Sequence, residues 1–136
     1  MSEAESFFDT SVLLYLLSAE PTKADRVEEL LAQRGVISVQ VLNEFTAVAT
    51  RKLGLSFAEI REVLGTVRTI CHTHPLELQH HDRGVEIAER YRFSFYVSVI
   101  IASALIAGCK TLYAEDLQHK QVIDKQLTVI NPFAKR

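Results

Sequence analysis

The chain has 136 residues, of which 48% are hydrophobic and 24% are charged, a composition typical of one globular domain over residues 1–136. This share of apolar residues excludes a largely disordered chain. The 15 basic and 17 acidic residues give a formal net charge of -2, which excludes a strongly basic coat for nucleic acid but not a small local binding surface.

The cysteines and the longest apolar run indicate the cellular setting. Cys71 and Cys109 lie far apart and form no C-x-x-C pair, so we expect free thiols in a reducing compartment rather than a disulfide scaffold or a structural zinc site. The acidic N-terminal segment is unlike a signal peptide, and the apolar run over residues 96–108 is shorter than the ~20 residues that cross a membrane. We therefore predict a cytoplasmic protein with no membrane contact.

Short apolar runs alternate with helical periods in the first half of the chain. Phe7 and Phe8 predict a buried strand, and Asp9 is placed to cap the helix that follows it. The next elements are indicated by apolar residues at spacings of three and four and by capping or glycine signals at the ends. They are a helix over residues 12–17, a helix from Thr22 that Gly35 stops, a strand over 36–38, a helix from 39 that Gly54 closes, and a helix that the capping box of Ser56 and Glu59 opens.

The second half continues the alternation. We expect an extended segment over residues 70–78, an amphipathic helix over 85–92 preceded by Asp82, a buried helix over 97–107 ended by Gly108, and strands over 111–113 and 127–130. Because the strands are separated by helices, the pattern predicts an α/β fold with a mostly parallel central sheet covered on both faces.

Acidic residues follow the predicted strands, where ligands bind in such sheets. Asp9 follows the first strand, Glu44 lies on the helix after the second, and Glu115 and Asp116 follow the strand over 111–113. Carboxylates that meet without basic partners repel one another and raise one another's pKa, unless a hard cation binds them. Oxygen ligands suit Mg²⁺ or Mn²⁺, which polarise phosphodiesters and ionise water, so the set indicates a metal-dependent nuclease.

Each of these acids also has a plainer structural interpretation. Asp9 can serve only as a helix cap, Glu44 as a solvated surface acid, and Glu115 with Asp116 as a turn and a cap. The sequence pattern leaves both interpretations open, and only the shared position at one rim of the sheet favours the site.

Five segments that span almost the whole chain carry motifs in a specific order. They are residues 8–15 (FDTSVLLY), 38–45 (SVQVLNEF), 93–96 (FSFY), 107–118 (AGCKTLYAEDLQ) and 131–133 (NPF). Together they resemble the PIN domain and, more closely, the toxin nuclease of bacterial VapBC toxin–antitoxin pairs.

The resemblance implies a three-layer α/β/α sandwich and a Mg²⁺- or Mn²⁺-dependent endoribonuclease that leaves a 3′-hydroxyl and a 5′-phosphate. It also implies a homodimer and a small antitoxin whose C-terminal segment covers the acidic groove. The residues that match the family's site are the acids Asp9, Glu44 and Asp116, with Glu115 adjacent as a further metal ligand and Thr10 or Ser11 as the neighbouring hydroxyl.

The sequence departs from the family at three positions. Val97 stands where similar proteins carry a third aspartate, at the start of the long buried helix, while Ala114 replaces a hydroxyl residue and Lys120 a glycine. Valine offers no metal ligand and caps no helix, so we expect weakened metal binding and impaired or absent cleavage, with fold and antitoxin binding retained. Val97 is compatible both with natural loss and with deliberate inactivation of a toxic protein.

Other polar residues have competing interpretations. A histidine-rich group could form a transition-metal site, although a structural or surface role is favoured for it. Its residues are His72, His74, His80 and His81, with Asp82. A set of basic residues could contact RNA or could serve only as ordinary surface and helix-end residues. They are Arg51, Lys52, Arg90, Arg92 and His119.

Three functions remain in competition after the sequence alone. The favoured one is a toxin ribonuclease with RNA as its substrate and an antitoxin as its partner. The second is a non-catalytic PIN-fold module that binds an antitoxin or RNA. A structure-selective DNA nuclease is disfavoured because such enzymes usually carry further domains.

Overall fold

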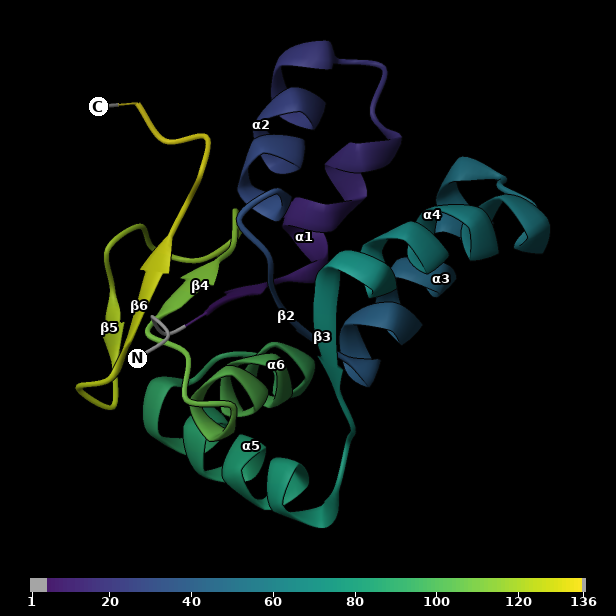
Figure 1. Ribbon diagram of the computed structural model, residues 1–136. Helices are drawn as coiled ribbons and strands as arrows, with labels where there is room; N and C mark the ends of the chain where they lie inside the picture. The colour runs from purple at the N-terminus through teal and green to yellow at the C-terminus, as the bar shows by residue number, and fades with distance from the viewer. Residues whose placement is uncertain (1–4, 136) are drawn as a thin grey trace.

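The computed structural model describes residues 5–135, which form a six-stranded sheet between layers of helices (Figure 1). The strands are β1 (Ser6–Phe8), β2 (Gly35–Ser38), β3 (Cys71–His74), β4 (Thr111–Tyr113), β5 (Val122–Ile123) and β6 (Leu127–Ile130). Their order across the sheet is β3-β2-β1-β4-β6-β5, and every neighbouring pair is parallel except β5 with β6. The predicted mostly parallel sheet is therefore confirmed.

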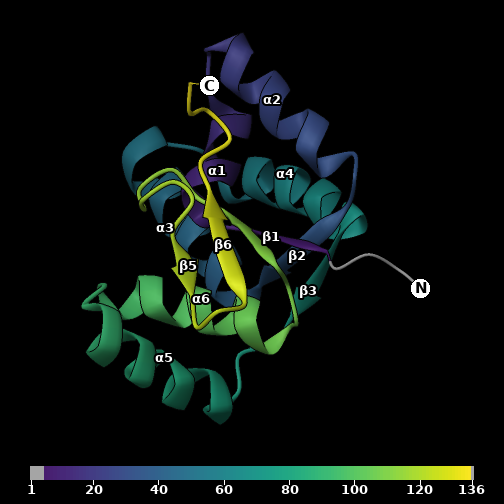
Figure 2. The same cartoon turned by 90° about the vertical axis from the view of Figure 1, so that its left-hand side faces the viewer.

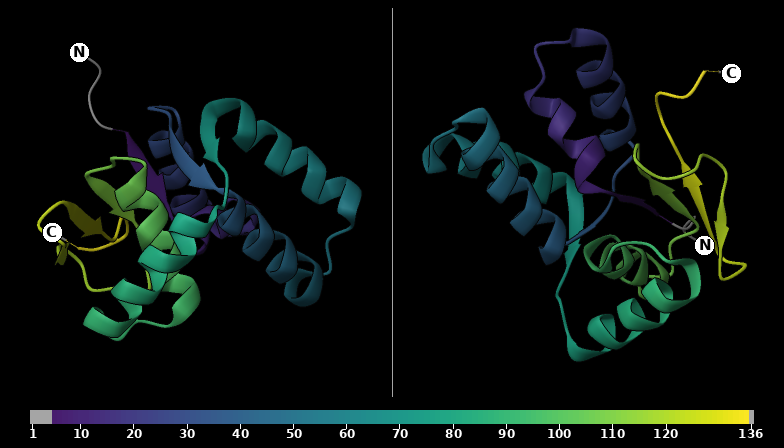
Figure 3. Two further views of the ribbon diagram at one scale, coloured as in Figure 1. Left: turned by 90° about the horizontal axis from the view of Figure 1, so that it is seen from below. Right: turned by 180° about the vertical axis from the view of Figure 1, so that it is seen from behind.

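The helices cover both faces of this sheet. They are α1 (Thr10–Leu13), the 3₁₀ helix η1 (Leu14–Leu17), α2 (Pro21–Leu31), α3 (Val39–Leu53), α4 (Phe57–Ile70), α5 (Leu78–Tyr91) and α6 (Phe95–Ile106). In Figures 1 and 2, α5 and α6 lie below the sheet and α1 and α2 lie above it. Figure 3 shows α3 and α4 side by side, extending away from the β5–β6 side of the sheet. The predicted three-layer α/β/α sandwich is confirmed.

The core lies between the strands and α6, which is buried on all sides as its uninterrupted apolar sequence predicts. Phe7, Phe8 and Leu112 are fully buried on the central strands. On the outer side of α6, α5 approaches so closely that a Cβ at Gly84 would lie 2.9 Å from Cγ2 of Val99. This close approach leaves room for glycine but for no larger residue.

Several predicted helix ends are confirmed, and one is wrong. Ser56 and Glu59 form the predicted capping box, and Gly54 ends α3 in the left-handed region at φ 67°. Gly35, however, belongs to β2 rather than ending α2, and Arg34 takes the left-handed conformation at φ 64° instead. Gly35 is needed for another reason, because a Cβ there would overlap the Phe8 ring.

The largest errors concern where elements begin. Helix α2 starts at Pro21 with Glu20 as its N-cap residue, two residues before the predicted Thr22 cap. Helix α5 starts at Leu78 rather than after Asp82, because Glu77 and His80 form a reciprocal capping box. Strand β5 was not predicted, since two residues carry no readable alternation.

Within residues 5–135, no helix combines the length and apolar character required to cross a membrane. Cys71 and Cys109 are buried and unpaired. Burial raises the pKa of the Cys71 thiol to about 11 and that of Cys109 to about 12, so neither is a reactive thiolate at neutral pH.

Candidate active site

The segments that follow β1 and β4 meet at one edge of the sheet. The backbone N–H of Asp9 donates to the carbonyl of Tyr113 at 2.9 Å, and the N–H of Ala114 donates to the carbonyl of Ile130 at 3.1 Å. These bonds place Asp9 beside the loop that carries Glu115 and Asp116. The carboxyl ends of the parallel strands β1 and β4 therefore bring the first and last acidic segments together, at the edge where ligands bind in such sheets.

Asp9 is both a helix cap and a buried acid. Its Oδ2 accepts hydrogen bonds from the N–H of Ser11 at 3.2 Å and from the Ser11 hydroxyl at 2.5 Å. Burial raises the pKa of Asp9 against the lowering effect of these bonds, and the nearby charge of Glu44 raises it further. The basic side chains of residues 5–135 form no ion pair with Asp9.

Two side chains hold the Glu44 carboxylate on α3. The Thr10 hydroxyl donates to Glu44 Oε1 at 3.1 Å, and the Gln40 amide donates to Oε2 at 2.9 Å. Thr10 follows Asp9 directly, so this bond ties the start of α1 to α3. Thr10 is predicted from the sequence but Gln40 is not, although residues one helical turn apart lie side by side on a helix and Gln40 stands one turn before Glu44.

Glu115 has a different environment from that of Asp9 and Glu44. Its Oε1 accepts from the Tyr15 hydroxyl at 2.6 Å, and its Oε2 pairs with Lys23 Nζ at 3.2 Å. Both carboxylate oxygens therefore have partners, one of them a cation, while the predicted role of Glu115 as a metal ligand stays a prediction. Neither Tyr15 nor Lys23 was singled out from the sequence.

Asp116 is exposed and borders an open cavity next to Glu115. The cavity has a volume of about 400 Å³, and Ser11 and Lys52 also line it. The predicted RNA contact at Lys52 thus lies on the same cavity as Asp116, whereas Arg51 is exposed on the last turn of α3 and does not line it. His119 has a structural partner, because its Nδ1 accepts from the N–H of Asn131 at 3.0 Å.

Val97 lies in the first turn of α6, half-buried against the core. The Ser94 hydroxyl caps this helix by accepting from the Val97 N–H at 3.4 Å. Val97 itself caps nothing, as expected, and the capping residue of this helix is Ser94. What the valine lacks is a carboxylate.

Residues 6–125 match the family described as the PIN domain. The chain belongs to the PIN-domain family. Among curated protein sequences, none matches this chain.

Solved structures of other PIN-like proteins have the same fold. A toxin–antitoxin complex from Klebsiella pneumoniae is similar over 94% of this chain and 98% of that one, with a TM-score of 0.70 and 16% identity. VapBC2 from Rickettsia felis, bound to a DNA fragment of its promoter, is similar over 91% and 96%, with a TM-score of 0.66 and 15% identity. VapC20 from Mycobacterium tuberculosis, a sarcin–ricin loop cleaving toxin, is similar over 82% and 89%, with a TM-score of 0.64 and 20% identity.

The donor set of this PIN domain offers two close carboxylates rather than a larger cluster. Within residues 5–135, no group of three or more His, Cys, Asp or Glu side chains lies close enough to hold a metal ion. The histidine-rich group therefore forms no metal site of three or more ligands among these residues either. The rings of His72 and His74 lie 4.5 Å apart, and His80 Nδ1 accepts a hydrogen bond from the Glu77 N–H at the start of α5. Asp9 and Glu44 suit Mg²⁺ or Mn²⁺, because such ions bind through one or two carboxylates when water and substrate phosphate complete the shell.

Two further departures of this PIN domain have structural effects. Ala114 is fully buried, so the site has no hydroxyl there. Lys120 lies in the left-handed region at φ 71°, a backbone conformation that glycine adopts without the steric cost of a side chain.

Proposed function

We propose that this PIN domain is the toxin of a type II toxin–antitoxin pair, with a Mg²⁺- or Mn²⁺-dependent endoribonuclease site formed by Asp9, Glu44 and Asp116. The observation that carries the proposal is the pair Asp9 and Glu44, held together at the sheet edge with no basic partner for Asp9. An antitoxin partner and a homodimer belong to the same proposal. The antitoxin partner is supported by the toxin–antitoxin complexes among the similar folds.

In this proposal Asp9 and Glu44 hold the cation, and Asp116 approaches from the neighbouring cavity. When bound, the ion supplies Lewis-acid polarisation of the phosphodiester and lowers the pKa of an attacking water. The Ser11 hydroxyl orients Asp9, and Thr10 and Gln40 orient Glu44, so the ligand oxygens are fixed before RNA arrives. Lys52 at the cavity attracts the RNA backbone.

Val97 reduces cleavage in this proposal because it removes one negative charge from the site. A site with fewer carboxylates attracts a divalent cation less strongly. The protein then retains its fold and its antitoxin surface, while its cleavage of RNA is weak or absent.

The experiment compares the chain with its Val97→Asp variant on structured RNAs, in the presence of Mg²⁺ or Mn²⁺. We expect Val97→Asp to cleave and the double variant with Asp9→Asn to lose that activity. Val97→Asn is the matched control, because it introduces a polar side chain of the same size without charge. No cleavage by any of these proteins on a panel of RNAs would overturn the catalytic proposal.

The second candidate is a non-catalytic PIN-fold module that binds an antitoxin or RNA. It is favoured by Val97 together with the finding that no three acids converge within residues 5–135. This function predicts that Val97→Asp stays inactive while the chain still binds an antitoxin or RNA.

A further inference from the structure

Four side chains from distant parts of the chain form a cluster beside the candidate site, here called the tail clamp: Tyr15, Lys23, Glu115 and Phe133. Lys23 Nζ lies 3.2 Å from both Glu115 Oε2 and the Tyr15 hydroxyl, and that hydroxyl donates to Glu115 Oε1 at 2.6 Å. The cluster therefore joins η1, α2 and the loop after β4.

Phe133 adds the C-terminal segment to the tail clamp. Its ring packs edge-on against the Tyr15 ring, with centroids 4.9 Å apart. Lys23 Nζ lies 4.6 Å from the centroid of Tyr15 and 5.1 Å from that of Phe133, distances at which an ammonium is attracted to aromatic faces. The chain after β6 runs up to α1 and α2 at this point (Figure 2).

Glu115 connects the tail clamp to Asp9 through Ser11. The backbone N–H of Glu115 donates to the Ser11 oxygen at 3.2 Å, and the Ser11 hydroxyl donates to Asp9 Oδ2. A serine hydroxyl has a single proton, so an N–H that approaches its oxygen directs that proton to another acceptor. Here the acceptor is Asp9, and the position of the Glu115 backbone decides the orientation of Ser11.

The tail clamp positions the loop after β4 more than it stabilises the fold. The Lys23 and Glu115 side chains are 31% and 26% exposed, and partly solvated ion pairs of this kind stabilise folds only slightly. Yet Glu115 is held at both oxygens and at its backbone N–H, which fixes the loop after β4 in one conformation.

We infer that Lys23, Tyr15 and Phe133 are positioning residues for Asp9, which act by fixing Glu115 and, through its backbone, the Ser11 hydroxyl. Glu115 is thus assigned to the support of the site rather than to the metal. The benefit to catalysis rests on the proposed nuclease function, whereas the positioning itself does not.

The experiment follows the Ser11 amide and the Asp9 carboxyl carbon by NMR in the metal-free protein. We expect Lys23→Met and Phe133→Leu to shift both signals. The Lys23→Arg variant should leave both signals near their positions in the parent chain, because arginine keeps the charge and the aromatic contact. Arg90→Met is the matched control: it removes an ion pair on α5 and should leave both signals unchanged. Melting curves verify that each variant is folded, and Phe133→Leu preserves apolar packing in case the charge variant unfolds.

A Mn²⁺ titration of the same proteins separates this inference from the proposed function. We expect Lys23→Met to bind Mn²⁺ about 10-fold more weakly than the parent chain, the lower end of the effect of outer-shell changes on metal affinity. Absence of Mn²⁺ binding in every protein, the Val97→Asp variant included, would count against the proposed nuclease, while the NMR signals still decide the positioning role. Unchanged Ser11 and Asp9 signals in Lys23→Met and Phe133→Leu would overturn the inference.

Discussion

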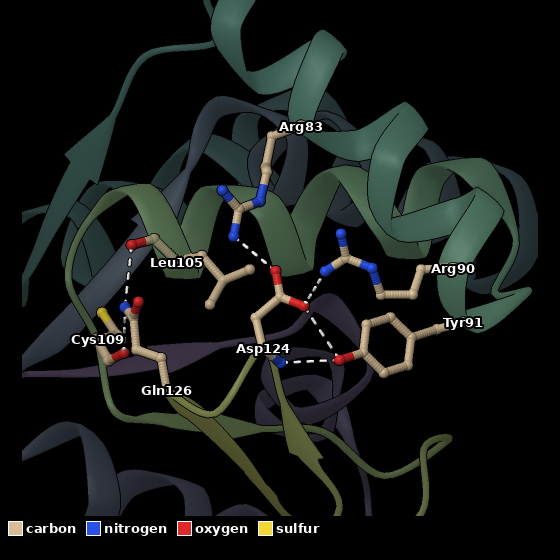
Figure 4. A network of polar contacts seen from close by, with 7 residues as sticks. All are labelled: Arg83, Arg90, Tyr91, Leu105, Cys109, Asp124 and Gln126. Carbon is tan, nitrogen blue, oxygen red and sulfur yellow. Dashed lines mark hydrogen bonds and ion pairs between the residues drawn. The ribbon is translucent and has the colours of Figure 1, made fainter.

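Two aspartates in this protein, Asp9 and Asp124, have opposite surroundings. Asp124, in the turn between β5 and β6, lies 2.6 Å from both Arg83 and Arg90, and the Tyr91 hydroxyl donates to it at 3.1 Å (Figure 4). Asp9 is held by the hydroxyl and N–H of Ser11 and has another acid as its charged neighbour.

The pKa shifts of the two groups differ in sign for this reason. Burial alone would raise the pKa of Asp124, but hydrogen bonds from Arg90, Tyr91 and Arg83 outweigh it and hold that pKa below its ordinary value. Burial raises the pKa of Asp9, and the Ser11 bonds do not compensate for it. The difference separates an acid that stabilises the fold from one whose charge is left for a ligand.

Removing the Asp124 carboxylate has the largest expected effect on stability. We expect Asp124→Ala to lower the free energy of unfolding by about 2 kcal/mol, because the largely buried carboxylate would no longer accept hydrogen bonds from Arg83 and Arg90, and the β5–β6 turn would lose its attachment to α5. Urea unfolding followed by circular dichroism measures this loss. A cost near that of an ordinary surface substitution would show that the Asp124 cluster does not hold the hairpin.

Removing the Asp9 charge should act in the opposite direction. Asp9→Asn keeps an oxygen that accepts from Ser11 but removes a buried charge that lies beside Glu44. We expect it to raise the free energy of unfolding by about 1 kcal/mol at pH 7, the gain typical of relieving a strained functional site, while binding of Mn²⁺ is lost. Destabilisation by Asp9→Asn as large as that by Asp124→Asn would contradict the comparison.

The pH dependence of these two variants tests the sign of each shift. A raised native pKa means that ionised Asp9 costs stability, fully so at neutral pH, and that this cost disappears as pH falls through the raised pKa toward the ordinary ~3.9. The gain from Asp9→Asn should therefore vanish in acid. The lowered pKa of Asp124 gives stability that is present above pH ~3.9 and lost as pH falls through the lowered value, so the cost of Asp124→Asn should also shrink there.

The sequence predicted Asp9 and Glu44 but not the Asp124 cluster, and the reason is the range of the contacts. Strand ends and helix faces can be read from local periodicity, which is why the acidic rim was predicted with the sheet. Asp124 meets Arg83, Arg90 and Tyr91 across 41, 34 and 33 positions of the chain, and no local pattern encodes such pairs.

The tail clamp was missed for the same reason. Tyr15 and Lys23 reach Glu115 across 100 and 92 positions. In the sequence, Glu115 is an acid that follows a strand, and nothing local indicates that a lysine from α2 lies 3.2 Å from it. Residue type and spacing thus predict that these acids share one edge of the sheet, whereas only the long-range contact with Lys23 gives Glu115 a counter-ion.

The smallest expected effects come from two tyrosines, one in each cluster. The Tyr91 hydroxyl both donates to the Asp124 carboxylate and accepts from its backbone N–H at 2.8 Å, so Tyr91→Phe should cost about 0.5–1 kcal/mol in urea unfolding. The Tyr15 hydroxyl contacts Glu115 and Lys23 in a part of the surface that water can reach, so Tyr15→Phe should cost less. The order should reverse for the NMR signal of Ser11, which Tyr15→Phe shifts and Tyr91→Phe leaves in place. Equal effects of both variants on stability and on the Ser11 signal would contradict the assignment of the Asp124 cluster to fold stability and of the tail clamp to the positioning of Ser11.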